Sequence, residues 1–140
     1  MTTELDPTRF PIQYIIQRIR QLPSEYEATV SGLSAGDLTK QYRPGSWTVA
    51  QLVHHVADTH VLHLLRFKHA LTELNTTAVN GDVNAWAMLD EAQTAPIADS
   101  ILLLRGLHQR IAYLGETLTP NQLAISYYHA NRQRDVTLAQ

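Results

Sequence analysis

The strongest constraint in this sequence is the spacing of its large apolar residues, which return every three or four positions in three long segments. The first covers residues 12–33, the second begins at about Val49 and passes Leu71, and the third runs from Pro96 to Leu118. This spacing places the apolar side chains on one face of an α-helix. No segment alternates strongly enough to build a sheet, so the sequence predicts an all-α helical bundle.

Several residues mark where these helices begin, end or bend. Thr48, with Gln51 three positions later, is the capping-box pattern that starts a helix. Pro96 is typical of the first turn of a helix, and it precedes the third segment. Pro23 lies inside the first segment and predicts a kink or a break near Leu22. The face that the second helix is expected to bury consists of Val49, Leu52, Val53, Val56, His60, His63, Leu64, Phe67 and Leu71.

A short pattern occurs twice in the chain. Each copy has a capped turn that ends in leucine, a tyrosine four residues later, and a second capping box. The two copies are Ser34–Leu38, Tyr42 and Thr48–Gln51, and Thr119–Leu123, Tyr127 and Thr137–Gln140. If the repeat is structural, the chain is a pair of helical units whose fourth helix is missing. The tail between the last two boxes is expected to form a small hairpin or an irregular loop.

Length and composition exclude several classes of protein. The 140 residues suit one domain, so residues 1–140 are expected to form a single unit. The net charge is −2 and the basic residues are dispersed, which argues against a nucleic-acid partner. The absence of cysteine excludes disulfides and thiol nucleophiles. Without a signal peptide or an apolar run of roughly 18 residues, a cytoplasmic protein with no membrane partner is expected.

Histidine is the residue type that raises a functional question. There are seven histidines, five of them from His54 to His69, and histidine is the commonest metal ligand. His60 and His63 project among apolar positions, where packing is the favoured interpretation and a shared metal is the alternative. His54 is expected to form an exposed pair with Asp58, four residues later.

The other histidines have weaker signals. His55 lies at the edge of the apolar face, in a stripe with Thr59, Leu62 and Arg66, where a side chain can reach a pocket between helices. Solvation is the usual state of such a residue, and metal ligation is the alternative. For the remaining three, which have no partner at ligand spacing, we expect solvated or packing roles: His69, His108 and His129.

Residues 45–73 contain the run W-T-V-A-Q-L-V-H-H-V-A-D-T-H, followed by R-F-K-H-A-L-T-E. With NAWAMLDEAQTAPI, SILLLRGLHQR and YYHA further on, this pattern resembles the YfiT-like branch of the DinB superfamily over nearly the whole chain. The resemblance implies an up-and-down four-helix bundle, usually homodimeric, which binds zinc or nickel through three histidines. Members of that branch are described as metal-dependent hydrolases, and some relatives act as thiol transferases on bacillithiol or similar low-molecular-weight thiols. It therefore implies a small-molecule substrate, for which such a thiol is one candidate.

The resemblance assigns one metal ligand in this chain. The first ligand of the family is the second histidine of the H-H pair, which is His55. The other two belong to an H-x-x-x-H motif on a last helix, which would follow the segment matching residues 135–140. The domain is therefore expected to be C-terminally incomplete, and one imidazole does not hold a catalytic ion.

Two functions remain open on the sequence, and no catalytic residue is assigned. The first is a metal-dependent hydrolase or thiol transferase that uses His55 as a ligand. The second is a truncated, non-catalytic helical domain that self-associates.

Overall fold

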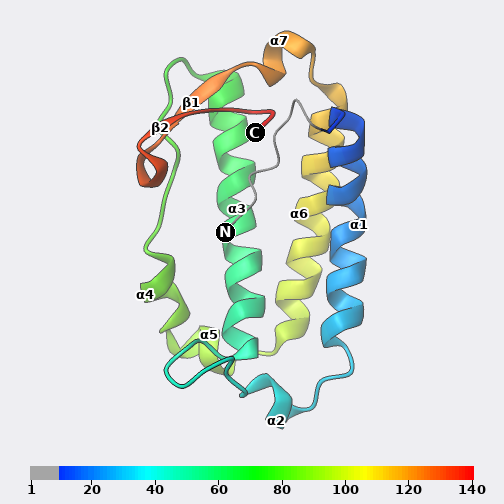
Figure 1. Ribbon diagram of the computed structural model, residues 1–140, viewed down its shortest axis with the longest axis vertical. Coiled ribbons are helices and arrows are strands. Elements are labelled where there is room, and N and C mark those ends of the chain that lie inside the picture. Colours follow the sequence, from blue (N-terminus) through cyan, green and yellow to red (C-terminus); the bar gives the residue numbers. More distant parts are fainter. Residues whose placement is uncertain (1–9) are drawn as a thin grey trace.

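The structure is a computed structural model, and it describes residues 10–140 (Figure 1). Its body consists of three long helices: α1 (Ile12–Val30), α3 (Val49–Thr72) and α6 (Ile97–Thr117). The short helices are α2 (Ala35–Leu38), α4 (Val83–Ala87), α5 (Asp90–Thr94) and α7 (Pro120–Leu123). An antiparallel hairpin follows, formed by β1 (Ser126–His129), the 3-10 turn η1 (Ala130–Arg132) and β2 (Arg134–Thr137). The predicted helical bundle is confirmed, and the tail forms the hairpin alternative.

The long helices lie side by side, with α6 packed against both α1 and α3 (Figure 1). α1 and α6 are antiparallel, and ion pairs join Arg20 to Glu116 at 2.7 Å and Glu27 to Arg105. None of the helices in residues 10–140 is long and apolar enough to cross a membrane.

α3 and α6 run in the same direction. His54 contacts Ser100 and His60 contacts His108, so residue numbers rise together along the two helices. The linker 73–96 returns along α3 to its first turn before α6 begins (Figure 1). The bundle therefore differs in this respect from the expected up-and-down order.

α1 continues through Pro23, so of the two alternatives near Leu22, a kink or a break, the break is wrong. Proline has no N–H, and the carbonyl of Ile19 therefore lacks its usual helical partner four residues later. In the structure, Nδ1 of His108 lies 2.7 Å from this carbonyl oxygen. A side chain of α6 thus replaces the missing hydrogen bond, and α1 remains helical.

α3 buries a different set of residues from the one predicted. Leu52 is 43% exposed, and His60 and His63 are half-buried. α4 and α5 pack against α3, and the hairpin contacts it, so a second face of this helix is covered. That face carries small and polar residues, which an apolar pattern does not reveal. The buried residues of α3 are Ala50, Gln51, Val53, His54, Ala57, Leu62, Arg66 and Ala70.

The repeated sequence pattern corresponds to a repeated local structure. Each copy begins with a four-residue helix, α2 or α7, whose capping box is closed by both reciprocal hydrogen bonds. An antiparallel backbone pairing then follows at equivalent positions in both copies. Gln41–Thr48 in the first copy corresponds to Ser126–Thr137 in the second. Likewise, Lys40–Val49 corresponds to Ile125–Leu138. The two copies lie at opposite ends of α3 (Figure 1).

Gly81 and Gly106 provide a matched test of the packing around α4. A Cβ on Gly81 would lie 1.9 Å from the indole of Trp86, so Gly81→Ala must displace that ring. We expect the free energy of unfolding to fall by about 1–3 kcal/mol, as in overpacked sites. Beyond its chain neighbours and the backbone of its own helix turn, no described atom lies within 4 Å of a Cβ on Gly106, inside α6. Gly106→Ala should therefore stabilise the protein by about 0.5–1 kcal/mol. Urea denaturation measures both values, and equal effects would contradict the packing described.

Candidate functional site

His54, near the start of α3, is a structural residue of the core. It is 2% exposed, its Nδ1 lies 2.7 Å from the hydroxyl oxygen of Ser100, and its Nε2 lies 3.1 Å from the carbonyl oxygen of Ala95. Because a carbonyl only accepts, Nε2 carries the proton in the neutral ring and Nδ1 accepts from the hydroxyl. The predicted surface pair with Asp58 is wrong, because the first residues of α6 cover this side of α3.

His55 has a different environment from its neighbour. It is half-buried, and its ring centroid lies 4.8 Å from that of Trp47, with the two planes at 57°. Among the described residues, neither ring nitrogen of His55 has a hydrogen-bond partner. His55 therefore lies at the edge of the helix interface, as expected, with both nitrogens available to a ligand.

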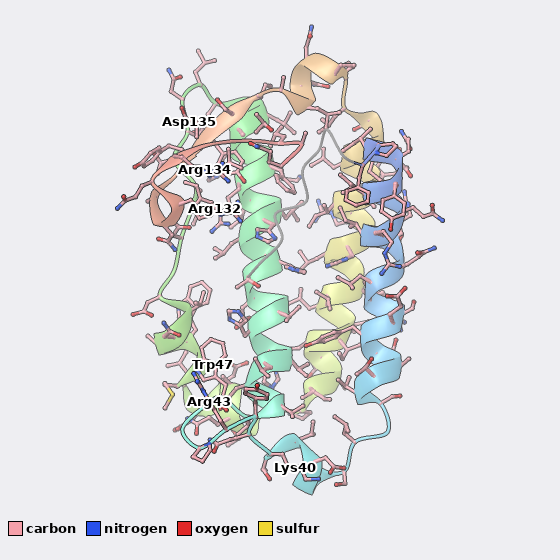
Figure 2. All side chains as sticks on the ribbon, viewed as in Figure 1. Lys40, Arg43, Trp47, Arg132, Arg134 and Asp135 are labelled. Carbon is pink, nitrogen blue, oxygen red and sulfur yellow. The ribbon has the colours of Figure 1, made fainter. Side chains whose placement is uncertain are left out.

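The loop before α3 forms a depression beside this residue. Trp47 and Arg43 lie near the first turn of α3 (Figure 2), and Trp47 is shared between the wall of the depression and the contact with His55. The depression has a volume of about 590 Å³ and is lined by Tyr42, Arg43, Gly45, Ser46, Trp47 and Leu52.

Two histidines form a hydrogen-bonded chain in the middle of the bundle. His108 donates from Nδ1 to the carbonyl of Ile19, so its Nε2 accepts when the ring is neutral. The partner of that nitrogen is Nδ1 of His60, 2.7 Å away, which must therefore carry a proton. The sequence offered no partner for His108, because the two histidines are 48 residues apart.

The surroundings of this chain keep the imidazoles neutral. Burial lowers the pKa of His60 to about 3, with smaller contributions from the neighbouring histidines. Burial also lowers the pKa of His63 to about 4, and the charge of Arg66 adds to this effect. The ring of His63 stacks on that of His60, with centroids 5.2 Å apart.

These histidines do not assemble into a complete metal centre. In residues 10–140 there is no group of three His, Cys, Asp or Glu side chains arranged to hold an ion. The rings of His60 and His63 are nearly parallel, so their in-plane lone pairs do not converge, and Nδ1 of His60 is already bonded to His108. The structure therefore favours packing for His60 and His63. The residues described do not fit a three-ligand site.

Sequence reasoning missed a polar group near the end of α3. Arg66 is 8% exposed and donates from Nε to the carbonyl of Val79 and from Nη2 to Oδ1 of Asn80, at 3.0 and 2.6 Å. Both acceptors are neutral, and among residues 10–140 no carboxylate forms an ion pair with this guanidinium. His129 on β1 is also 8% exposed, and its Nδ1 is buried without a hydrogen-bond partner. The only sequence signal was the position of Arg66 in the stripe of His55.

The depressed pKa values of His60 and His63 predict an acid-sensitive fold. In the unfolded chain both histidines titrate near the ordinary value of 6.5. Between pH 6.5 and about 4, the unfolded state therefore binds more protons, and the free energy of unfolding should fall as the pH falls. Urea denaturation at several pH values measures this slope, and His63→Phe should reduce it by about one proton. Gly106→Ala, which adds no titratable group, should leave it unchanged, whereas a flat profile in the wild type would contradict burial of neutral imidazoles.

Comparison with known proteins places this arrangement in a family. Residues 18–139 match the family model of the DinB superfamily. The protein named "Putative metal-dependent hydrolase YfiT" from Bacillus subtilis is 37% identical over 123 residues, which cover 88% of this chain and 69% of the relative. A "Putative metal-dependent hydrolase" from Halalkalibacterium halodurans is 41% identical over 118 residues, covering 84% of this chain and 68% of its own length.

A solved structure agrees with the sequence relatives. It is that of YfiT from Bacillus subtilis, called "a probable metal-dependent hydrolase with an unusual four-helix bundle topology". It matches with a TM-score of 0.88 and 35% identity, over 91% of this chain and 73% of that one. This chain, in which α3 and α6 run parallel, therefore has the same fold as YfiT. This chain belongs to the DinB superfamily, in its YfiT-like branch.

Proposed function

We propose that this chain functions as a metal-dependent hydrolase or thiol transferase on a small-molecule substrate, with His55 as one ligand of a zinc or nickel ion. The state of His55 carries the proposal: it is half-buried, it rests on Trp47, and both its nitrogens lack hydrogen-bond partners among residues 10–140. A structural histidine such as His54 uses both nitrogens. The metal dependence in the names of the Bacillus and Halalkalibacterium relatives supports the metal.

His55 supplies one imidazole, whereas a catalytic zinc ion normally has three protein ligands. The other ligands of the proposed centre would lie outside residues 10–140 or on a second copy of the chain. The described residues position His55: the hydrogen bonds of His54 hold the start of α3 to Ser100 of α6 and to Ala95 just before that helix, and Trp47 limits the orientations of the imidazole. The His55 ring is thereby held at one place on the bundle.

The depression lined by Trp47 is the place we propose for the substrate. Its volume, about 590 Å³, lies within the range of small-molecule sites, roughly 300–1,000 Å³. Its lining combines aromatic rings with the guanidinium of Arg43 and the hydroxyl of Ser46. A molecule bound there would share Trp47 as a wall with His55. The low-molecular-weight thiol suggested by the family is a substrate of suitable size.

Metal titration tests the assignment of His55. Metal-free protein is titrated with Zn²⁺ and, separately, with Ni²⁺ in a calorimeter at pH 7. We expect His55→Ala to weaken binding at least about tenfold, because the loss of one ligand costs 1.4 kcal/mol or more. The control is His69→Ala, near the other end of α3, which should bind within about twofold of the wild type. Equal binding by His55→Ala and the wild type would reject the ligand, and absence of uptake by the wild type would reject a metal site formed by this chain or by two copies of it.

One observation favours the second candidate function, a non-catalytic domain that forms homodimers. A groove of about 130 Å³ runs between α1, α6 and residues 138–140, and its lining is mostly isoleucine and leucine. Apolar surface of this kind is often an interface. Under this proposal, sedimentation equilibrium should show a monomer–dimer transition, and the melting temperature should rise with protein concentration. A monomer with a constant melting temperature at all concentrations would reject it.

A further inference from the structure

A second polar site lies at the far end of α3 from His55, where the hairpin crosses the helix. Arg66 is eleven residues after His55, which corresponds to about 16 Å along a helix axis. Figure 2 labels Arg132 and Arg134 on the hairpin, beside the second half of α3. The site is therefore separate from the candidate ligand and has a chemistry of its own.

The pleat of the hairpin decides which side chains face α3. In β1, Tyr127 and His129 are buried while Tyr128 is exposed, so the first two point inward. Asp135 pairs with Tyr128 across the hairpin, and directly paired residues share a face. The carboxylate of Asp135 thus belongs to the outer face, away from Arg66.

Two nitrogens at this site have no hydrogen-bond partner within the described residues, and one of them is buried. Nε and Nη2 of Arg66 hold the linker at Val79 and Asn80, but Nη1 has no hydrogen-bond partner there. Nδ1 of His129 is buried without a partner. A purely structural role for Arg66 accounts for its two bonded nitrogens and leaves the buried histidine unexplained. Buried polar groups without partners are rare because each costs free energy.

Guanidinium charges act on both His129 and Arg66. The guanidinium groups of Arg66 and Arg132 both act on His129, whose pKa is lowered by burial first and then by these two charges. The charge of Arg132 likewise acts on Arg66, and burial lowers the pKa of Arg66. Buried positive charge is stabilised by a bound anion.

We propose that this site binds an oxyanion, the carboxylate or phosphate group of a small molecule, through Nη1 of Arg66 and a protonated Nδ1 of His129. A guanidinium and an imidazole donor are well suited to oxyanion oxygens, because hydrogen bonds to an ionised acceptor are among the strongest. The site needs no metal at His55, so it stands whether or not the function proposed above is correct.

The test follows the imidazole of His129 in the intact wild-type chain by ¹⁵N NMR. Sodium phosphate and sodium acetate are added in separate titrations, with sodium chloride keeping the ionic strength constant. We expect a saturable shift of the His129 ring nitrogens toward the protonated form, because a neighbouring anion raises the pKa of an imidazole. Saturation with phosphate alone or with acetate alone would support the site and identify the oxyanion it accepts.

Two variants locate the binding site. Arg66→Met should weaken binding at least about tenfold, and Arg110→Met, on an exposed position of α6, should change it less than about twofold. If Arg66→Met does not fold, the response of His129 in the wild type decides. The proposal is overturned if neither anion gives a saturable response of His129. It is also overturned if sodium chloride reproduces the response. Equal affinity in folded Arg66→Met and the wild type also overturns it.

Discussion

The hydrogen-bond chain from the carbonyl of Ile19 through His108 to His60 connects all three long helices. It begins with a defect, because Pro23 leaves that carbonyl without a helical donor. Since the carbonyl accepts only, it fixes the proton of His108, and His108 in turn fixes the proton of His60. One carbonyl of α1 without a helical N–H donor therefore determines the tautomers of two side chains, one on α6 and one on α3. The relative positions of the three helices must satisfy the two distances of 2.7 Å at the same time.

The sequence was sufficient for the elements that depend on local patterns. The long helices, the capping box at Thr48 and the repeated turns follow from apolar spacing and hydrogen bonds between near neighbours. It was not sufficient where a distant segment changes the environment of a residue. Pro23 is accommodated by a side chain from α6, and His54 is buried by the residues that begin that helix. Neither contact leaves a trace at short sequence separation.

The candidate site was predictable to a similar degree. The edge position of His55 follows from helical geometry, whereas its contact with Trp47 depends on the path of the preceding loop. The surroundings of Arg66 required the hairpin and the linker to lie on the same face of α3. His129 is 63 residues away along the chain, in a segment that carried no periodic signal. His55 and Arg66 thus lie in different surroundings near the two ends of α3. Each environment is formed by a segment that the apolar pattern of the helix does not describe.

The repeated turn has a further consequence for how the two ends of α3 differ. Both copies close a backbone pairing, but the second copy has four more residues between its tyrosine and its threonine. The first copy carries Trp47 to His55, and the longer second copy contains η1 with Arg132. The two turns therefore differ mainly in the length of the loop that connects their paired backbone segments. Because the backbone pairing is the same in both copies, a change in loop length alters the side chains presented at one end of α3 without requiring a change in the helix or at its opposite end.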